Sequence, residues 1–93
     1  MLFMVIETFR HGPEPVYRRF RENGRMLPEG LTYLDSWVDA GHNRCFQLME
    51  CADLSLFHAW TARWDDLVSF EIVPVQASRE AAARHEATPD RGE

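Results

Sequence analysis

Three acidic side chains embedded in apolar segments are the residues of this chain best placed to do chemistry. Glu7, Asp35 and Glu71 each lie among apolar residues in a short run. A carboxyl group that folding removes from water acquires a raised pKa, and it then serves as a general acid or base near neutral pH. Tyr33 and Trp37 flank Asp35 and offer aromatic surface to a flat or cationic ligand. The candidate ligand-binding residues are Glu7, Tyr33, Asp35, Trp37, Gln47 and Glu71.

The same carboxylates have a plainer interpretation. Arg44, or arginines of a second subunit, can pair with them and hold an interface together. Buried charges in proteins are more often paired than reactive. Three roles therefore stay open for this set, namely interface contact, ligand recognition and catalysis, and the pattern designates no catalytic residue.

The arginine-only basic set excludes several reaction types for this chain. All ten basic residues are Arg, so no lysine is present to form a Schiff base, hold pyridoxal phosphate covalently or bind phosphate in a P-loop. The net charge of −5 argues against nucleic-acid binding, which needs a positive field. The sequence also shows no catalytic-triad signature, and its histidines lack companions at metal-ligand spacing. We therefore expect no metal, no cofactor and no nucleic-acid partner.

The cysteines and the apolar runs predict the cellular location of the protein. Cys45 and Cys51 lie on one predicted strand, roughly 20 Å apart, so they cannot bridge each other. Two buried free thiols are typical of a cytoplasmic protein. The apolar first residues lack the basic leader and cleavage site of a signal peptide, and no apolar run approaches the roughly 18–20 residues of a membrane span. We expect a cytoplasmic location and no membrane partner.

A β-hairpin over residues 31–51 is the centre of the predicted architecture. Two apolar-rich runs flank Gly41-His42-Asn43, and Gly and Asn tolerate the positive φ that a tight turn needs. The other predicted elements are a strand at residues 1–8, a helix at 13–23, a helix of about three turns at 54–64 that follows the N-capping Asp53, a strand at 67–75 and a short helix at 78–87.

This order of elements predicts a ferredoxin-like α+β fold. Two right-handed crossovers joined by a hairpin give βαββαβ, a four-stranded antiparallel sheet in the order 4-1-3-2 with both helices on one face. Residues 1–76 would form this domain, and residues 77–93 a short helix and a disordered tail.

The sheet face away from the helices should decide what the protein binds. Alternation along each strand divides the side chains between the two faces. The residues expected to face the helices are Leu34, Val38, Phe46, Leu48, Val68, Phe70 and Ile72. The open face would carry Phe3, Val5, Glu7, Tyr33, Asp35, Trp37, Asp39, Cys45, Gln47, Met49, Cys51, Ser69, Glu71 and Val73. So much apolar surface predicts a homodimer whose two sheets pack face to face and enclose a polar-rimmed cavity.

Three segments carry a resemblance to a known family. They are GRMLPEGLTYLDSWVD at residues 24–39, RCFQLMEC at 44–51 and WTARWDDLVSFEIVPV at 60–75, in which Arg63-Trp64 is the most distinctive pair. Over nearly all of residues 1–76 the chain resembles a small bacterial family, a domain of unknown function in the dimeric α/β-barrel superfamily. The resemblance implies the ferredoxin-like fold and a homodimer, and it implies no activity.

Better-studied members of that superfamily include cofactor-free quinone and polyketide monooxygenases, haem-degrading monooxygenases and ligand-sensing domains. The haem-degrading group uses an Asn on the first strand, a Trp, and a His on the second helix. This chain has no Asn on its first strand, and His58 lies about 120° from the centre of the apolar stripe of its helix. We therefore expect His58 on the surface and no haem.

Three function classes remain. The first is a homodimer that binds a small organic ligand between its sheets. The second is a cofactor-free monooxygenase or isomerase acting on a small aromatic or quinone-like molecule. The third is a structural or protein-interaction module whose dimer interface is fully packed.

Overall fold

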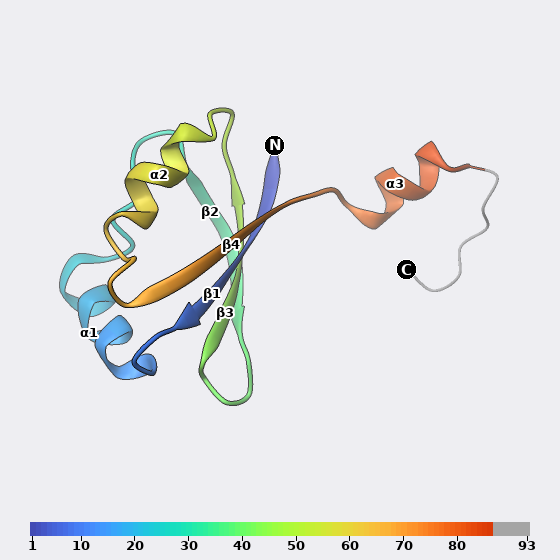
Figure 1. Cartoon of the computed structure of the whole chain (residues 1–93). Coiled ribbons are helices and arrows are strands. Elements are labelled where there is room, and N and C mark those ends of the chain that lie inside the picture. Colours follow the sequence, from blue (N-terminus) through green and yellow to red (C-terminus); the bar gives the residue numbers. More distant parts are fainter. Residues whose placement is uncertain (87–93) are drawn as a thin grey trace.

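The computed structural model describes residues 1–86 and has a four-stranded antiparallel sheet with two helices on one face (Figure 1). Its elements are β1 (Leu2–Phe9), α1 (Pro13–Asn23), β2 (Thr32–Val38), β3 (Arg44–Glu50), α2 (Ser55–Thr61), β4 (Val68–Val75) and α3 (Ser78–Arg84). The strands lie in the order β2-β3-β1-β4. The predicted βαββαβ fold and strand order are confirmed.

Helix α1 begins and ends where its sequence signals predicted. Pro13 and Pro15 lie in the first turn, where a missing N–H costs no helical hydrogen bond. Gly24 ends the helix with a φ of 69°, and its N–H donates to the carbonyl of Phe20 at 2.7 Å. Val16 is the buried residue of the helix and faces the sheet.

The hairpin turn takes its positive φ at an unexpected residue. His42 has a φ of 58°, whereas the sequence pointed to the flanking Gly and Asn. The Asp39 carboxylate accepts the backbone N–H groups of Asn43 and Arg44 at 2.9 and 3.1 Å. These hydrogen bonds hold the pKa of Asp39 below its ordinary value, and they fix the chain reversal at the turn.

Helix α2 is shorter than predicted. Asp53 precedes it as expected, and its carboxylate accepts the N–H of Ser55 at 2.9 Å. The regular helix ends at Thr61, and turns continue the chain as far as Leu67. Trp64 nevertheless reaches the core from these turns and is 5% exposed.

The predicted faces of β1 and β3 are reversed in the structure. Residues directly opposite in an antiparallel pair lie on one face, and Phe3 is opposite Met49 while Val5 is opposite Gln47. All four are buried under the helices. The predictions that Phe3, Val5, Glu7, Cys45, Gln47, Met49 and Cys51 lie on the open face, and that Phe46 and Leu48 face the helices, were therefore wrong. The prediction for β4 was right, because Val68, Phe70 and Ile72 pack with the core.

A β-bulge between Tyr33 and Asp35 divides β2 between the two faces. Tyr33 is opposite Met49 and so lies on the helix side, contrary to the prediction. Trp37 is opposite Phe46 and lies on the open face with Asp35, as predicted. Leu34, at the bulge, is 44% exposed rather than buried.

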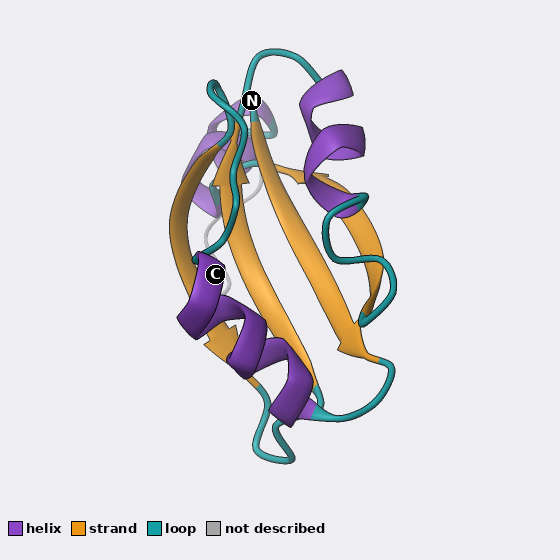
Figure 2. Ribbon diagram, turned by 90° about the vertical axis from the view of Figure 1, so that its left-hand side faces the viewer, coloured by secondary structure: helices purple, strands orange, loops and turns teal. Residues whose placement is uncertain are grey.

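The chain leaves the sheet after β4 as an arm that carries α3. In both views α3 lies on the side of the sheet opposite α1 and α2 (Figures 1 and 2). It buries no residue. The radius of gyration is 15.4 Å, against about 12 Å for a compact chain of this length, and the arm accounts for the excess. The tail predicted to be disordered, residues 88–93, lies outside the described residues.

In the part of the chain that the structure describes, no helix combines the length and the apolar character needed to cross a bilayer.

Candidate functional site

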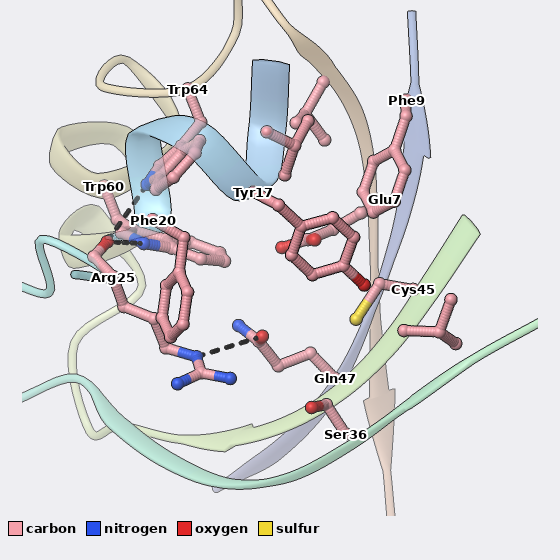
Figure 3. Close-up of a pocket in the computed structure, with 13 residues that line it drawn as sticks. Glu7, Phe9, Tyr17, Phe20, Arg25, Ser36, Cys45, Gln47, Trp60 and Trp64 are labelled. Carbon is pink, nitrogen blue, oxygen red and sulfur yellow. Dashed lines mark hydrogen bonds between the residues drawn. The ribbon is translucent and has the colours of Figure 1, made fainter. Parts of the chain in front are cut away.

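A cavity of about 110 Å³ lies between α1 and the helix face of the sheet. We call it the α1 cavity; its lining comes from all four strands, from α1 and α2, and from the loop after α1 (Figure 3). Its rim includes Tyr17 and Phe20 of α1 and Val38 of β2, which are 38%, 39% and 41% exposed. The cavity is therefore open to solvent between α1 and the edge strand β2.

Glu7 places a carboxyl group in this cavity. Its register opposite Cys45 and Phe70 turns its side chain toward the helices, and Figure 3 shows the carboxyl beside the ring of Tyr17. Among residues 1–86, no group hydrogen-bonds to this carboxyl. Burial raises the pKa of Glu7 from 4.5 to about 7, although the positive charge of Arg25 acts in the opposite direction.

Arg25 is the cationic group of the cavity. Its Nε donates to Oε1 of Gln47 at 3.4 Å. Its guanidinium lies 3.6 Å from the ring centroid of Tyr33 and 5.0 Å from that of Phe20. The two terminal nitrogens have no hydrogen-bond partner within the described part of the chain. They are donors that a ligand can use.

The backbone of Arg25 is anchored by two tryptophans. The indole Nε1 atoms of Trp60 and Trp64 both donate to its carbonyl oxygen, each at 3.0 Å. Arg63 donates to the next carbonyl, that of Met26, at 2.5 Å. The Arg63-Trp64 pair thus holds the loop after α1, and this loop presents the Arg25 side chain to the cavity.

Gln47 is buried in the cavity floor and already has partners. It is 4% exposed, accepts from Arg25 and donates to the sulfur of Met49 at 3.3 Å.

Two further titratable groups line the cavity, Cys45 and Tyr17. Burial raises the pKa of the Cys45 thiol to about 11, so this cysteine is protonated and a poor nucleophile at neutral pH. Burial likewise raises the pKa of Tyr17.

The six candidate residues from the sequence do not form one site. Glu7 and Gln47 line the α1 cavity, and Tyr33 lies beneath Arg25 on the same side. The other three candidates, Asp35, Trp37 and Glu71, lie on the open face of the sheet. The α1 cavity is also on the opposite side of the sheet from the expected pocket.

Sequence reasoning missed Arg25, Tyr17 and the two tryptophans as parts of a site. Arg25 belongs to a cluster of arginines around α1, most of which are exposed. The signal that distinguishes it is its position directly after the helix stop at Gly24, where the chain crosses back over the sheet. Trp60 and Trp64 are buried, and their indole N–H groups also orient Arg25.

The histidines contribute nothing to this cavity. His58 is exposed on α2, as predicted. Within residues 1–86, no three His, Cys, Asp or Glu side chains come together in an arrangement that could hold a metal ion.

A family model described as a domain of unknown function (DUF3303) matches residues 1–89. The chain belongs to this family. The DUF3303 match covers every element of the fold, the α1 cavity and the Arg63-Trp64 pair. The predicted membership in a family of unknown function is thereby confirmed, whereas the dimeric α/β-barrel superfamily stays a prediction. No curated protein and no solved structure matches the chain.

Proposed function

We propose that this protein binds a small organic molecule in the α1 cavity and works as a homodimer. The observation that carries the first part is the Glu7 carboxyl, which is half-buried in an open cavity and has no hydrogen-bond partner among the described residues. Its oxygens face the open space of the cavity, and desolvation raises the pKa of the group to about 7. A polar ligand in the cavity would hydrogen-bond to this carboxyl.

The size and walls of the cavity favour a ligand with one ring. Aromatic side chains from β1, α1, α2 and the turn after α2 line it, namely Phe9, Tyr17, Phe20, Trp60 and Trp64. A dry protein cavity of roughly 150 Å³ holds benzene. The α1 cavity has about 110 Å³ and an open mouth, so a single ring fits with part of its surface at the rim.

The open face of the sheet supports the homodimer. Trp37 is 52% exposed there, and the half-buried Met4, Ile6, Phe46 and Leu48 lie on the same face. Contiguous apolar surface of this kind is unfavourable in water. A second copy would cover it by packing sheet against sheet, and the arm with α3, which projects on this side, would then meet the partner. Ligand and partner would thus use opposite faces.

Ligand binding is tested by titrating phenol and recording the NMR signals of the Trp60 and Trp64 indole N–H groups. We expect saturable shifts in the wild-type chain. Val38→Trp, at the rim, should weaken binding at least tenfold. Leu34→Trp is the matched control, because it lies on the same strand, is similarly exposed and does not line the cavity. Absence of shifts at these signals, or equal affinity in both variants, would contradict the proposal.

The dimer is tested by light scattering across a micromolar concentration series. We expect twice the chain mass for the wild type and a monomer for Trp37→Asp. Leu54→Asp is the control, because Leu54 is 58% exposed but precedes α2 on the helix side. A monomeric wild type, or a Trp37→Asp variant that still dimerises, would rule out this interface.

Glu7 also supports a second candidate function, proton transfer in a cofactor-free isomerase. A carboxyl group with a pKa of about 7 is suited to act as a general base at neutral pH. The test is exchange of the α-protons of cyclohexanone in D₂O, followed by NMR. Acceleration by the wild type that is lost in Glu7→Gln would support this function, and equal rates with and without protein would reject it.

A further inference from the structure

We propose that the α1 cavity selects a small planar monocarboxylate, whose two oxygens bind the Arg25 guanidinium and the protonated Glu7 carboxyl together. This inference rests on the proposed ligand-binding function and specifies its ligand class. It follows from the arrangement of hydrogen-bond donors in the cavity.

Arg25 is prepared for such a ligand before it binds. Its backbone carbonyl is held by Trp60 and Trp64, and its guanidinium is stacked on the ring of Tyr33. The Nε–H group of Arg25 donates to Gln47, so the two terminal nitrogens are the donors that a ligand can reach. A planar guanidinium whose orientation is already set binds a carboxylate with little further loss of side-chain entropy.

Glu7 and Arg25 are near enough to interact electrostatically but do not pair. Arg25 lowers the pKa of Glu7, yet no ion pair within 4.0 Å joins the two side chains in the described structure. When Glu7 is protonated, the cavity carries the single positive charge of Arg25. A monoanion placed between the two groups neutralises this charge and accepts a hydrogen bond from each.

Most of the other polar groups of the cavity already have partners. The oxygen and the nitrogen of the Gln47 amide each make one hydrogen bond. The Ser36 hydroxyl shares a hydrogen bond of 2.7 Å with the Tyr33 hydroxyl. The strongest donors left for a ligand in the described structure are therefore the terminal nitrogens of Arg25, the Tyr17 hydroxyl and, in its protonated form, Glu7, with one amide hydrogen of Gln47 beside them.

Binding should be linked to one proton. The titratable groups that face Glu7 are Arg25 on the loop, Tyr17 on α1 and Cys45 on β3, while the lining from β2, α2 and β4 is uncharged. The pKa values of Tyr17 and Cys45 are raised, so both stay protonated at neutral pH. Affinity for a carboxylate should then fall about tenfold for each pH unit above the pKa of Glu7, which is about 7.

The test compares benzoate with its neutral analogue benzamide by isothermal titration. Between about pH 5.5 and about pH 8.5, benzoate should lose roughly thirtyfold in affinity while benzamide changes less than twofold. Glu7→Gln should bind benzoate with the same affinity at both pH values. Arg25→Gln should weaken benzoate at least tenfold and leave benzamide unchanged.

The pKa of Glu7 can also be measured in the wild-type chain, so this test does not depend on how well a variant folds. The pKa of Glu7, followed by NMR of its side-chain carboxyl carbon in the wild-type chain, should rise when benzoate is bound. A pKa that falls or stays constant would overturn the inference. Benzamide binding as tightly as benzoate at low pH would also overturn the ligand class but leave the proposed function intact. If neither compound nor phenol binds, the proposed function itself fails.

Discussion

The indole N–H groups of Trp60 and Trp64 donate to the same acceptor, the carbonyl oxygen of Arg25, each at 3.0 Å. Both tryptophans are almost fully buried, and they come from α2 and from the turn that follows it. Two elements that lie far along the chain from Arg25 therefore set the position of the loop after α1. This arrangement links the stability of the fold to the geometry of the cavity.

This shared acceptor predicts non-additive destabilisation. Trp60→Phe or Trp64→Phe alone leaves the Arg25 carbonyl with one donor, so each should cost about 1–2 kcal/mol in hydrogen bonding and packing. The double variant leaves that carbonyl without a donor and should cost about 1 kcal/mol more than the two single variants together. Urea unfolding of the four proteins measures this coupling, and additive free energies would contradict it.

Glu7 should make the protein less stable as pH rises. Its folded pKa of about 7 lies above its ordinary value of 4.5, so the folded state retains a proton that the unfolded chain releases. The contribution of Glu7 to stability is therefore greatest below about pH 4.5, declines by about 3 kcal/mol as pH rises to 7 and beyond, and then levels off. Glu7→Gln should remove this decline in urea unfolding at about pH 5 and pH 8. Glu71→Gln, on the open face, is the matched control, and this variant should show the same decline in stability as the wild type.

The Arg19–Asp66 pair should contribute stability that is lost in acid. The guanidinium donates to both carboxylate oxygens at 2.8 Å, and these hydrogen bonds lower the pKa of Asp66 from 3.8 to about 2. A lowered folded pKa means that the contribution is complete above 3.8 and disappears as pH falls through about 2. The difference in urea midpoint between wild type and Asp66→Asn should thus shrink between about pH 5 and pH 2. Asp65→Asn, next to it in the chain, should show no such change.

His42 should be an unfavourable residue for its position in the hairpin. Its φ of 58° is costly for a residue with a Cβ, and its side chain is exposed. His42→Gly should raise the free energy of unfolding by about 0.5–1 kcal/mol, because the relief of strain exceeds the entropy that glycine loses. His42→Val should lower it by about 1 kcal/mol or more, since a β-branched residue tolerates this conformation least. Thermal unfolding distinguishes these results, and a destabilised glycine variant would contradict the prediction.

The order of elements could be read from the sequence because each element depends on local rules. Pro13 and Pro15 suit the first turn of a helix but not its interior, and Gly24 supplies the positive φ that ends it. Asp53 marks the start of α2. These signals act within a few residues, so the βαββαβ order followed from the sequence alone. The strand order then followed from that order of elements, because crossovers between parallel strands are right-handed.

The division of side chains between the two faces depended on tertiary structure. On β1 both alternating sets are apolar, so a period of two residues does not distinguish Phe3 and Val5 from Met4 and Ile6. On β3 hydrophobicity favoured burying Phe46, but the structure buries Gln47 instead, because Arg25 and Met49 satisfy its amide. Burying a polar side chain costs free energy unless a hydrogen-bond partner, here from elsewhere in the chain, reaches it.

The sequence by itself therefore determined the elements, their order and the family, whereas the tertiary structure decided where a site lies. The bulge at Tyr33 moved one predicted residue to the helix side, and the crossover after α1 brought Arg25 toward Glu7. Contacts between residues so far apart along the chain form only when the layers pack. Strand alternation carries no information about that packing, because it describes each strand separately.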